Sequence, residues 1–118
     1  CSSSIRTLQT MDIISHDLNY YVNKIVDKKL YGASDEMLIN YISFLDDKLN
    51  NVGIIGHQPG LQELAFTLVS SYAEGYDKVL NGNFSTSNAI LILLNIKRWD
   101  QISSRVGILA DYFDSKNY

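Results

Sequence analysis

Apolar residues along the chain follow two different spacings, one typical of helices and one typical of strands. In residues 4–14, 35–49 and 61–72 they recur at every third or fourth position, which predicts three amphipathic helices. Residues 52–55 and 89–96 are short, nearly continuous apolar runs, which predict strands covered on both faces. A last strand is predicted at 106–112, at an edge of the sheet because Asp111 and Asp114 interrupt the apolar pattern there. Helices that alternate with strands in this way favour an α/β fold.

Single residues with special backbone preferences place the ends of these helices. Ser3 and Ser34 suit the N-cap position ahead of the first and second helices, where a side-chain oxygen accepts a free backbone N–H. Pro59 suits the first position of the third helix, where its missing N–H costs nothing. Between these elements we expect a short strand within residues 21–30, a loop over 73–86 and a helical turn at 99–102.

Composition narrows the class of protein. A chain of 118 residues with 46% apolar content suits one domain, residues 1–118, with a core of its own. The net charge of −3 and the lack of basic runs give no electrostatic reason to bind nucleic acid. The longest apolar run, residues 89–94, is too short to cross a bilayer, so no membrane association is expected. Cys1 is the only cysteine, which excludes an internal disulfide and makes the cytoplasm the expected compartment.

Two side chains stand where a ligand site would form. His57 follows the strand predicted at 52–55, at the carboxyl edge of the sheet, where open α/β folds bind their ligands. Arg6 lies at the start of the first helix. A guanidinium, an imidazole and helix N-terminal N–H groups together suit a phosphoryl group, and Ser3 and Thr7 would add hydroxyl donors. Taken singly, an arginine or histidine so placed is more often solvated or structural. Taken together, Arg6, His57 and Ser3 predict a phosphate site.

The residues around these side chains resemble two motifs of the histidine phosphatase superfamily, the phosphoglycerate mutase-like proteins. The segments are residues 2–10, SSSIRTLQT, and residues 52–60, VGIIGHQPG, and their order and spacing match the family pattern. Residues 30–34 and 61–66 make the chain most similar to the small SixA-type phosphohistidine phosphatases. The resemblance covers nearly the whole chain and implies a three-layer α/β/α fold with a mainly parallel sheet, and a site without a metal or cofactor. It also implies a histidine nucleophile, with Arg6 and His57 as the catalytic residues that bind the phosphoryl group and stabilise its charge.

The family's first motif, a strand that ends in Arg-His-Gly or Arg-His-Ala, has no counterpart in these 118 residues. Cys1 aligns with the end of the family's second strand, so the N-terminal strand and its nucleophile are expected to be missing through truncation or processing. His16 follows a helix in a polar stretch and is expected to be solvated. Asp35 and Glu36 are the carboxylates nearest to where larger relatives carry a general acid, but helix capping is their expected role. The fragment is therefore expected to be inactive.

These observations predict that the complete protein is a hydrolase that removes phosphate from phosphohistidine in a protein, such as a phosphotransfer domain, through a covalent phosphohistidine enzyme intermediate. Two alternatives are a phosphatase that acts on small phosphate esters and a module that binds phosphate or phosphoproteins without chemistry. Because the absent strand would leave unpaired backbone groups in the sheet, we also expect one of two arrangements. Either the missing strand is present as a separate segment, or copies of the chain pair or swap through the gap as a homo-oligomer.

Overall fold

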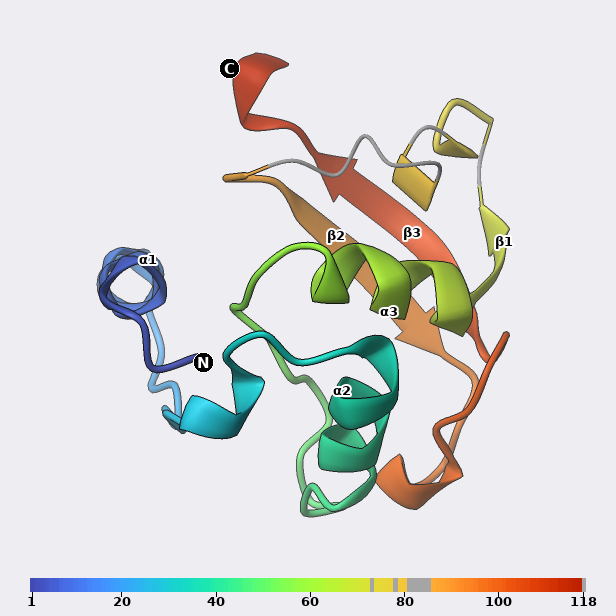
Figure 1. Ribbon diagram of the computed structural model, residues 1–118, viewed down its shortest axis with the longest axis horizontal. Coiled ribbons are helices and arrows are strands. Elements are labelled where there is room, and N and C mark those ends of the chain that lie inside the picture. Colours follow the sequence, from blue (N-terminus) through green and yellow to red (C-terminus); the bar gives the residue numbers. More distant parts are fainter. Residues whose placement is uncertain (73, 78, 81–85, 118) are drawn as a thin grey trace.

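The described residues, which in this computed structural model are 1–72, 74–77, 79–80 and 86–117, contain a mixed three-stranded sheet (Figure 1). Its strands are β1 (Val69–Tyr72), β2 (Ala89–Leu94) and β3 (Gly107–Phe113), in the order β1-β3-β2. β3 runs parallel to β1 and antiparallel to β2. The α-helices of the described residues are α1 (Ile5–Asp17), α2 (Asp35–Ser43) and α3 (Gly60–Leu68). The predicted α/β class is confirmed, and the sheet is mixed where a mainly parallel one was predicted.

β3 occupies the middle of the sheet, so the prediction that the last strand lies at an edge is wrong. Asp111 is tolerated there because its Oδ1 accepts the backbone N–H of Tyr112 at 2.8 Å and the hydroxyl of Tyr76 at 3.3 Å. Burial, and secondarily the Asp111 carboxylate, raises the pKa of the Tyr76 hydroxyl above its usual value. A shift in the pairing register between Leu91 and Ile92 of β2 accommodates the irregularity.

The third predicted helix is shorter than its apolar spacing suggests. α3 ends at Leu68, and residues 69–72, which were predicted to continue it, form β1 instead. Val69 and Tyr72 are residue types that favour strands, and pairing with β3 supplies the backbone partners that decide the outcome. The loop predicted at 73–86 includes residues 73, 78 and 81–85, which lie outside the described residues.

α2 follows the sequence pattern closely at its start and on its buried face. Ser34 is the N-cap, and its side chain accepts the backbone N–H of Met37 at 3.3 Å. Leu38 and Ile42 are buried, as predicted, against Leu64 of α3. The helix ends at Ser43, short of the predicted residue 49. The main apolar cluster joins α2, α3 and the turns around them: Leu30, Ala33, Leu38, Ile42, Leu64, Leu68 and Ile102.

The helices cover the sheet unequally. α3 lies in front of β2 and β3 with α2 beside it, while α1 stands apart at the other side of the molecule (Figure 1). On the side of the sheet away from the core, β2 and β3 carry apolar side chains that are about half exposed, namely Leu91, Leu93, Ile108 and Phe113. The prediction that residues 89–96 form a strand covered on both faces is therefore wrong, because alternate side chains of β2 are exposed. The three-layer arrangement and the pairing of copies through the sheet stay predictions.

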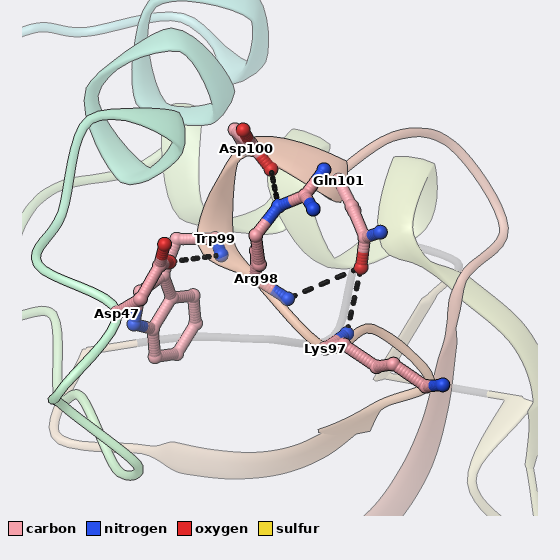
Figure 2. Close-up of polar contacts among 6 residues, drawn as sticks. All are labelled: Asp47, Lys97, Arg98, Trp99, Asp100 and Gln101. Atoms are coloured by element: carbon pink, nitrogen blue, oxygen red, sulfur yellow. Dashed lines mark hydrogen bonds and ion pairs between the residues drawn. The ribbon is translucent and has the colours of Figure 1, made fainter.

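A short helical turn follows the C-terminal end of β2 and is hydrogen-bonded to the segment after α2. It is η3 (Trp99–Gln101), which confirms the turn predicted at 99–102. Figure 2 shows the Gln101 carboxamide oxygen accepting the backbone N–H groups of Lys97 and Arg98, at 2.7 and 3.1 Å, and Asp47 accepting that of Trp99 at 2.9 Å. The Trp99 indole N–H also donates to the carbonyl of Leu49 at 2.9 Å. The two bonds of Trp99 join η3 to the segment that follows α2.

Candidate functional site

Three extended segments lie side by side next to the predicted site: residues 1–2, 25–27 and 52–55. The Cys1 nitrogen donates to the Ile25 carbonyl at 2.8 Å, and the Asp27 N–H donates to the Cys1 carbonyl at 2.9 Å, which is the pattern of parallel strands. On the other side, the Ser2 N–H donates to the Ile55 carbonyl at 3.0 Å. Residues 1–2 therefore lie between residues 25–27 and 52–55.

Neither neighbour of residues 1–2 forms the regular strand that the sequence predicts. Residues 52–55 are extended without strand assignment, and Val52 is 39% exposed, so the prediction of a strand covered on both faces is wrong there. Residues 21–30 likewise contain no strand and end in the short helical turn η1 (Lys28–Leu30). One or two ladder hydrogen bonds are too few to define a strand, because pairing along several residues is what stabilises one.

The two segments that carry the predicted site meet through Ser2 and His57. The Ser2 hydroxyl and His57 Nε2 lie 2.7 Å apart, and Ser2 is completely buried. The Tyr31 ring and the imidazole pack in a T-shaped arrangement, with a centroid distance of 5.0 Å and an interplanar angle of 68°. The imidazole is thus held by a serine 55 positions away in the sequence and by a ring from the turn before α2.

The serine that meets His57 is not the one that the sequence analysis selected. Ser3, the predicted phosphate-binding residue and N-cap, is exposed. Ser4 caps α1 instead, because its side chain accepts the backbone N–H of Thr7 at 3.3 Å. The Thr7 hydroxyl donates to the Ser2 carbonyl at 2.7 Å. The prediction that Thr7 offers its hydroxyl to a ligand is therefore wrong. Ser2 is the residue that sequence reasoning missed, since only its place in the extended segment before α1 distinguishes it from its neighbours.

Arg6 lies in the first turn of α1 and is exposed. Its guanidinium makes no hydrogen bond or ion pair with any residue that the structure describes. Ser2 thus contacts His57 directly. Arg6, four residues later in the chain, is exposed to solvent. Among the described residues no carboxylate forms an ion pair with Arg6, so its charge is free to bind an anion.

The other titratable residues considered from the sequence take structural or solvated positions. His16 is exposed in the last turn of α1, as expected. Asp35 lies in the first turn of α2, and its Oδ2 accepts the hydroxyl of Thr67 at 2.8 Å, which ties α2 to α3. The Asp27 carboxylate accepts the backbone N–H of Lys29 at 2.9 Å. This hydrogen bond is the largest cause of the lowered pKa of Asp27.

The loop that carries His57 is placed by a close contact of Gly60. A Cβ at this position would overlap the carbonyl oxygen of Ala33 and would lie 3.7 Å from the side chain of Leu38. Because Gly60 lacks that atom, the start of α3 packs against the turn before α2, and this turn also brings Tyr31 onto the imidazole. The Leu61 N–H donates to the His57 carbonyl at 3.1 Å and so joins the loop to the helix.

A separate hollow of about 470 Å³ lies beside η3, lined by Asn95, Ile96, Lys97, Gln101 and Val106. It contains none of the residues that the sequence analysis selected. The described residues contain no group of three or more histidine, cysteine, aspartate or glutamate side chains that could hold a metal ion. Within the same part of the chain, every helix is too short or too polar to cross a membrane.

Comparisons with protein-family models, with curated proteins and with solved structures found no match to this chain. The assignment of a function therefore rests on the residues and their geometry.

Proposed function

We propose that the chain is the part of a phosphohistidine phosphatase-like hydrolase that binds the phosphoryl group through Arg6 and His57. The observation that carries the proposal is the 2.7 Å hydrogen bond between Ser2 Oγ and His57 Nε2, which joins the two segments whose sequences resemble the histidine phosphatase motifs. The exposed, unpaired guanidinium of Arg6 in the same segment as Ser2 supports it further. The substrate is phosphohistidine in a protein, for example a phosphotransfer domain.

In this proposal Arg6 and His57 stabilise the negative charge of the phosphoryl oxygens and do not act as nucleophiles. The Arg6 guanidinium donates two parallel hydrogen bonds to phosphoryl oxygens, a geometry that suits a planar guanidinium. The His57 imidazole donates one hydrogen bond and opposes the charge that develops on those oxygens in the transition state. The histidine that would attack phosphorus is not among these 118 residues, since His16 lies exposed at the far end of α1. The chain by itself is expected to bind phosphate without turnover.

The first prediction is that the chain binds inorganic phosphate, and that Arg6→Ala weakens the binding at least about tenfold, equivalent to about 1.4 kcal/mol. The reason is the loss of the charged bidentate donor. Titration calorimetry of the wild-type chain and the variant measures the change. Arg98→Ala is the matched control, because it removes the same charge from an exposed arginine already paired with Asp100 at 3.1 Å.

Equal weakening by Arg6→Ala and Arg98→Ala would show that binding reflects net charge alone, and the proposed site would then be abandoned. The enzymatic part has its own test with a phosphohistidine peptide and p-nitrophenyl phosphate. Turnover by the 118-residue chain that disappears in His16→Ala would contradict the proposed absence of the nucleophile.

A phosphoprotein-binding module without catalysis is the second candidate. It is favoured by the surroundings of His57. Among the described residues, the His57 side chain makes a hydrogen bond only with Ser2 and a ring contact only with Tyr31. Neither residue supplies a general acid to a leaving group. Measurement of a phosphohistidine peptide that binds tightly and is never hydrolysed, even when the chain is joined to an upstream Arg-His segment, would favour this module over the hydrolase.

A further inference from the structure

Ser2 is held in position by hydrogen bonds at its N–H, its carbonyl and its hydroxyl. Its N–H donates to the Ile55 carbonyl at 3.0 Å, and its carbonyl accepts the Thr7 hydroxyl at 2.7 Å. Its side chain is completely buried, and His57 Nε2 is the partner of its hydroxyl at 2.7 Å. This hydrogen bond is well determined, because a buried hydroxyl left without a partner would lose its hydration and gain nothing in return.

The hydrogen bond at Nε2 decides what the rest of the imidazole can do. A neutral imidazole carries one N–H, and the bond made by one ring nitrogen sets which nitrogen holds the proton. If Nε2–H donated to Ser2, the other nitrogen, Nδ1, would present a lone pair, which repels a phosphoryl oxygen. If the Ser2 hydroxyl donates to Nε2, Nδ1 carries the proton and is a donor. Only the second arrangement lets neutral His57 bind an anion.

We propose that Ser2 is a positioning residue that donates its hydroxyl proton to Nε2 and so holds His57 as the Nδ1–H tautomer, with Nδ1 as the atom that binds the phosphoryl oxygen. This inference rests on the proposed function and names the atom through which that site works. Tyr31 contributes by packing against the ring, which restricts its rotation. Ser2 itself, being completely buried, does not touch the ligand.

The test is nitrogen-15 NMR of the imidazole in the labelled chain at a pH where His57 is neutral. The two nitrogens of His57 have different shifts in the two tautomers, and His16, which is exposed, serves as the internal reference for a solvated ring. The wild-type chain is expected to show the Nδ1–H tautomer alone. A wild-type spectrum with the proton on Nε2 overturns the inference, and this measurement needs no variant to fold.

The variant Ser2→Ala is expected to give a mixture of tautomers and to weaken phosphate binding several-fold. Ser3→Ala is the matched control, because Ser3 is the exposed neighbour in the same segment. A Ser2→Ala variant that folds and keeps the wild-type tautomer and phosphate affinity overturns the inference, since a merely structural serine would leave both unchanged.

The two proposals fail in different ways. A wild-type chain that binds no phosphate overturns the proposed function and with it the role of Nδ1 as a ligand donor. A chain that binds phosphate through Arg6 but holds the His57 proton on Nε2 overturns the inference about Ser2 alone and leaves the proposed function standing.

Discussion

At the scale of single residues, glycine positions determine how closely the backbone segments approach one another. Gly60 lies against the carbonyl of Ala33, and Gly107, the first residue of β3, lies where a Cβ would be 2.6 Å from Ile92 and 3.1 Å from the Leu68 carbonyl. Gly60 lies where α3 meets the turn before α2, and Gly107 lies where β3 meets β2 and the end of α3. A side chain at Gly60 would have to move backbone, whereas one at Gly107 would first have to displace the side chain of Ile92.

We predict that Gly60→Ala destabilises the chain by about 1–3 kcal/mol, the usual cost of overpacking. Helix propensity alone would predict the opposite, since alanine in a helix is favoured over glycine by about 1 kcal/mol. The clash with the Ala33 carbonyl should win because that atom belongs to the backbone. Urea unfolding followed by circular dichroism measures the difference.

Gly53→Ala is the control for this experiment, because a Cβ at Gly53 would meet nothing within 4 Å. Gly60→Ala should also disturb the imidazole signals of His57, since Gly60 positions the loop beside Tyr31. A Gly60→Ala chain that is as stable as wild type would mean that α3 can move away from the turn before α2 at little cost.

At the scale of elements, the helix caps are local features whose contributions can be separated from the core. Ser34 accepts the Met37 N–H, and Asp35 and Glu36 place negative charge in the first turn of α2, where the helix dipole favours it. α1 is capped in the same way by Ser4. The two helices differ in what they bury: α2 contributes Leu38 and Ile42 to the core, whereas Thr7 is the buried residue of α1.

We predict that Ser34→Ala lowers the free energy of unfolding by about 1 kcal/mol, the typical value of an N-cap side chain. The helix and the core unfold together, so the loss should appear in the stability of the whole domain. Thermal unfolding measures it. Ser43→Ala, at the other end of α2, is the control, because the Ser43 hydroxyl bonds only within the helix, to the Asn40 carbonyl. Equal effects of the two variants would contradict a capping role for Ser34.

At the scale of the whole molecule, the apolar core is continuous but leaves α1 outside it. A second cluster of Val69, Val79 and Leu109 meets the main one through Leu61 and Ile92, which pack against both. α1 supplies no residue to either cluster, and Ile5 and Ile13 on its surface are 74% and 66% exposed. The amphipathic pattern of α1 therefore lacks the partner that its apolar side chains would need to contribute to stability.

This arrangement predicts two levels of protection from amide hydrogen exchange. Amides of α3 and β3 should exchange only when the domain unfolds, whereas those of α1 should exchange at least about tenfold faster through local opening, since few buried contacts hold them. Exchange measured by NMR, corrected for intrinsic rates, tests this. The amides of α2 are the matched helical control. Equal protection of α1 and α2 would mean that α1 packs against the core in solution.

The sequence by itself determined the features that depend on residues close together in the chain. The cap and buried face of α2, the apolar strand β2 and the turn η3 were predicted because a capping serine, a helical spacing or an apolar run acts within a few residues. The α/β class followed from the alternation of these signals. Arg6 and His57 were selected in the same way, from the short segments around them.

Only the tertiary structure decided the features that depend on partners far away in the sequence. Residues 69–72 became a strand because β3 pairs with them, and β3 became central because it has neighbours on both sides. Residues 52–55 did not form the predicted strand, since their pairing with Ser2 is limited to one backbone bond. The fold also decided which serine bonds to His57: Ser2 is buried beside the imidazole, whereas Ser3 is exposed. The three consecutive serines carry the same chemistry and differ only in what the fold places beside them.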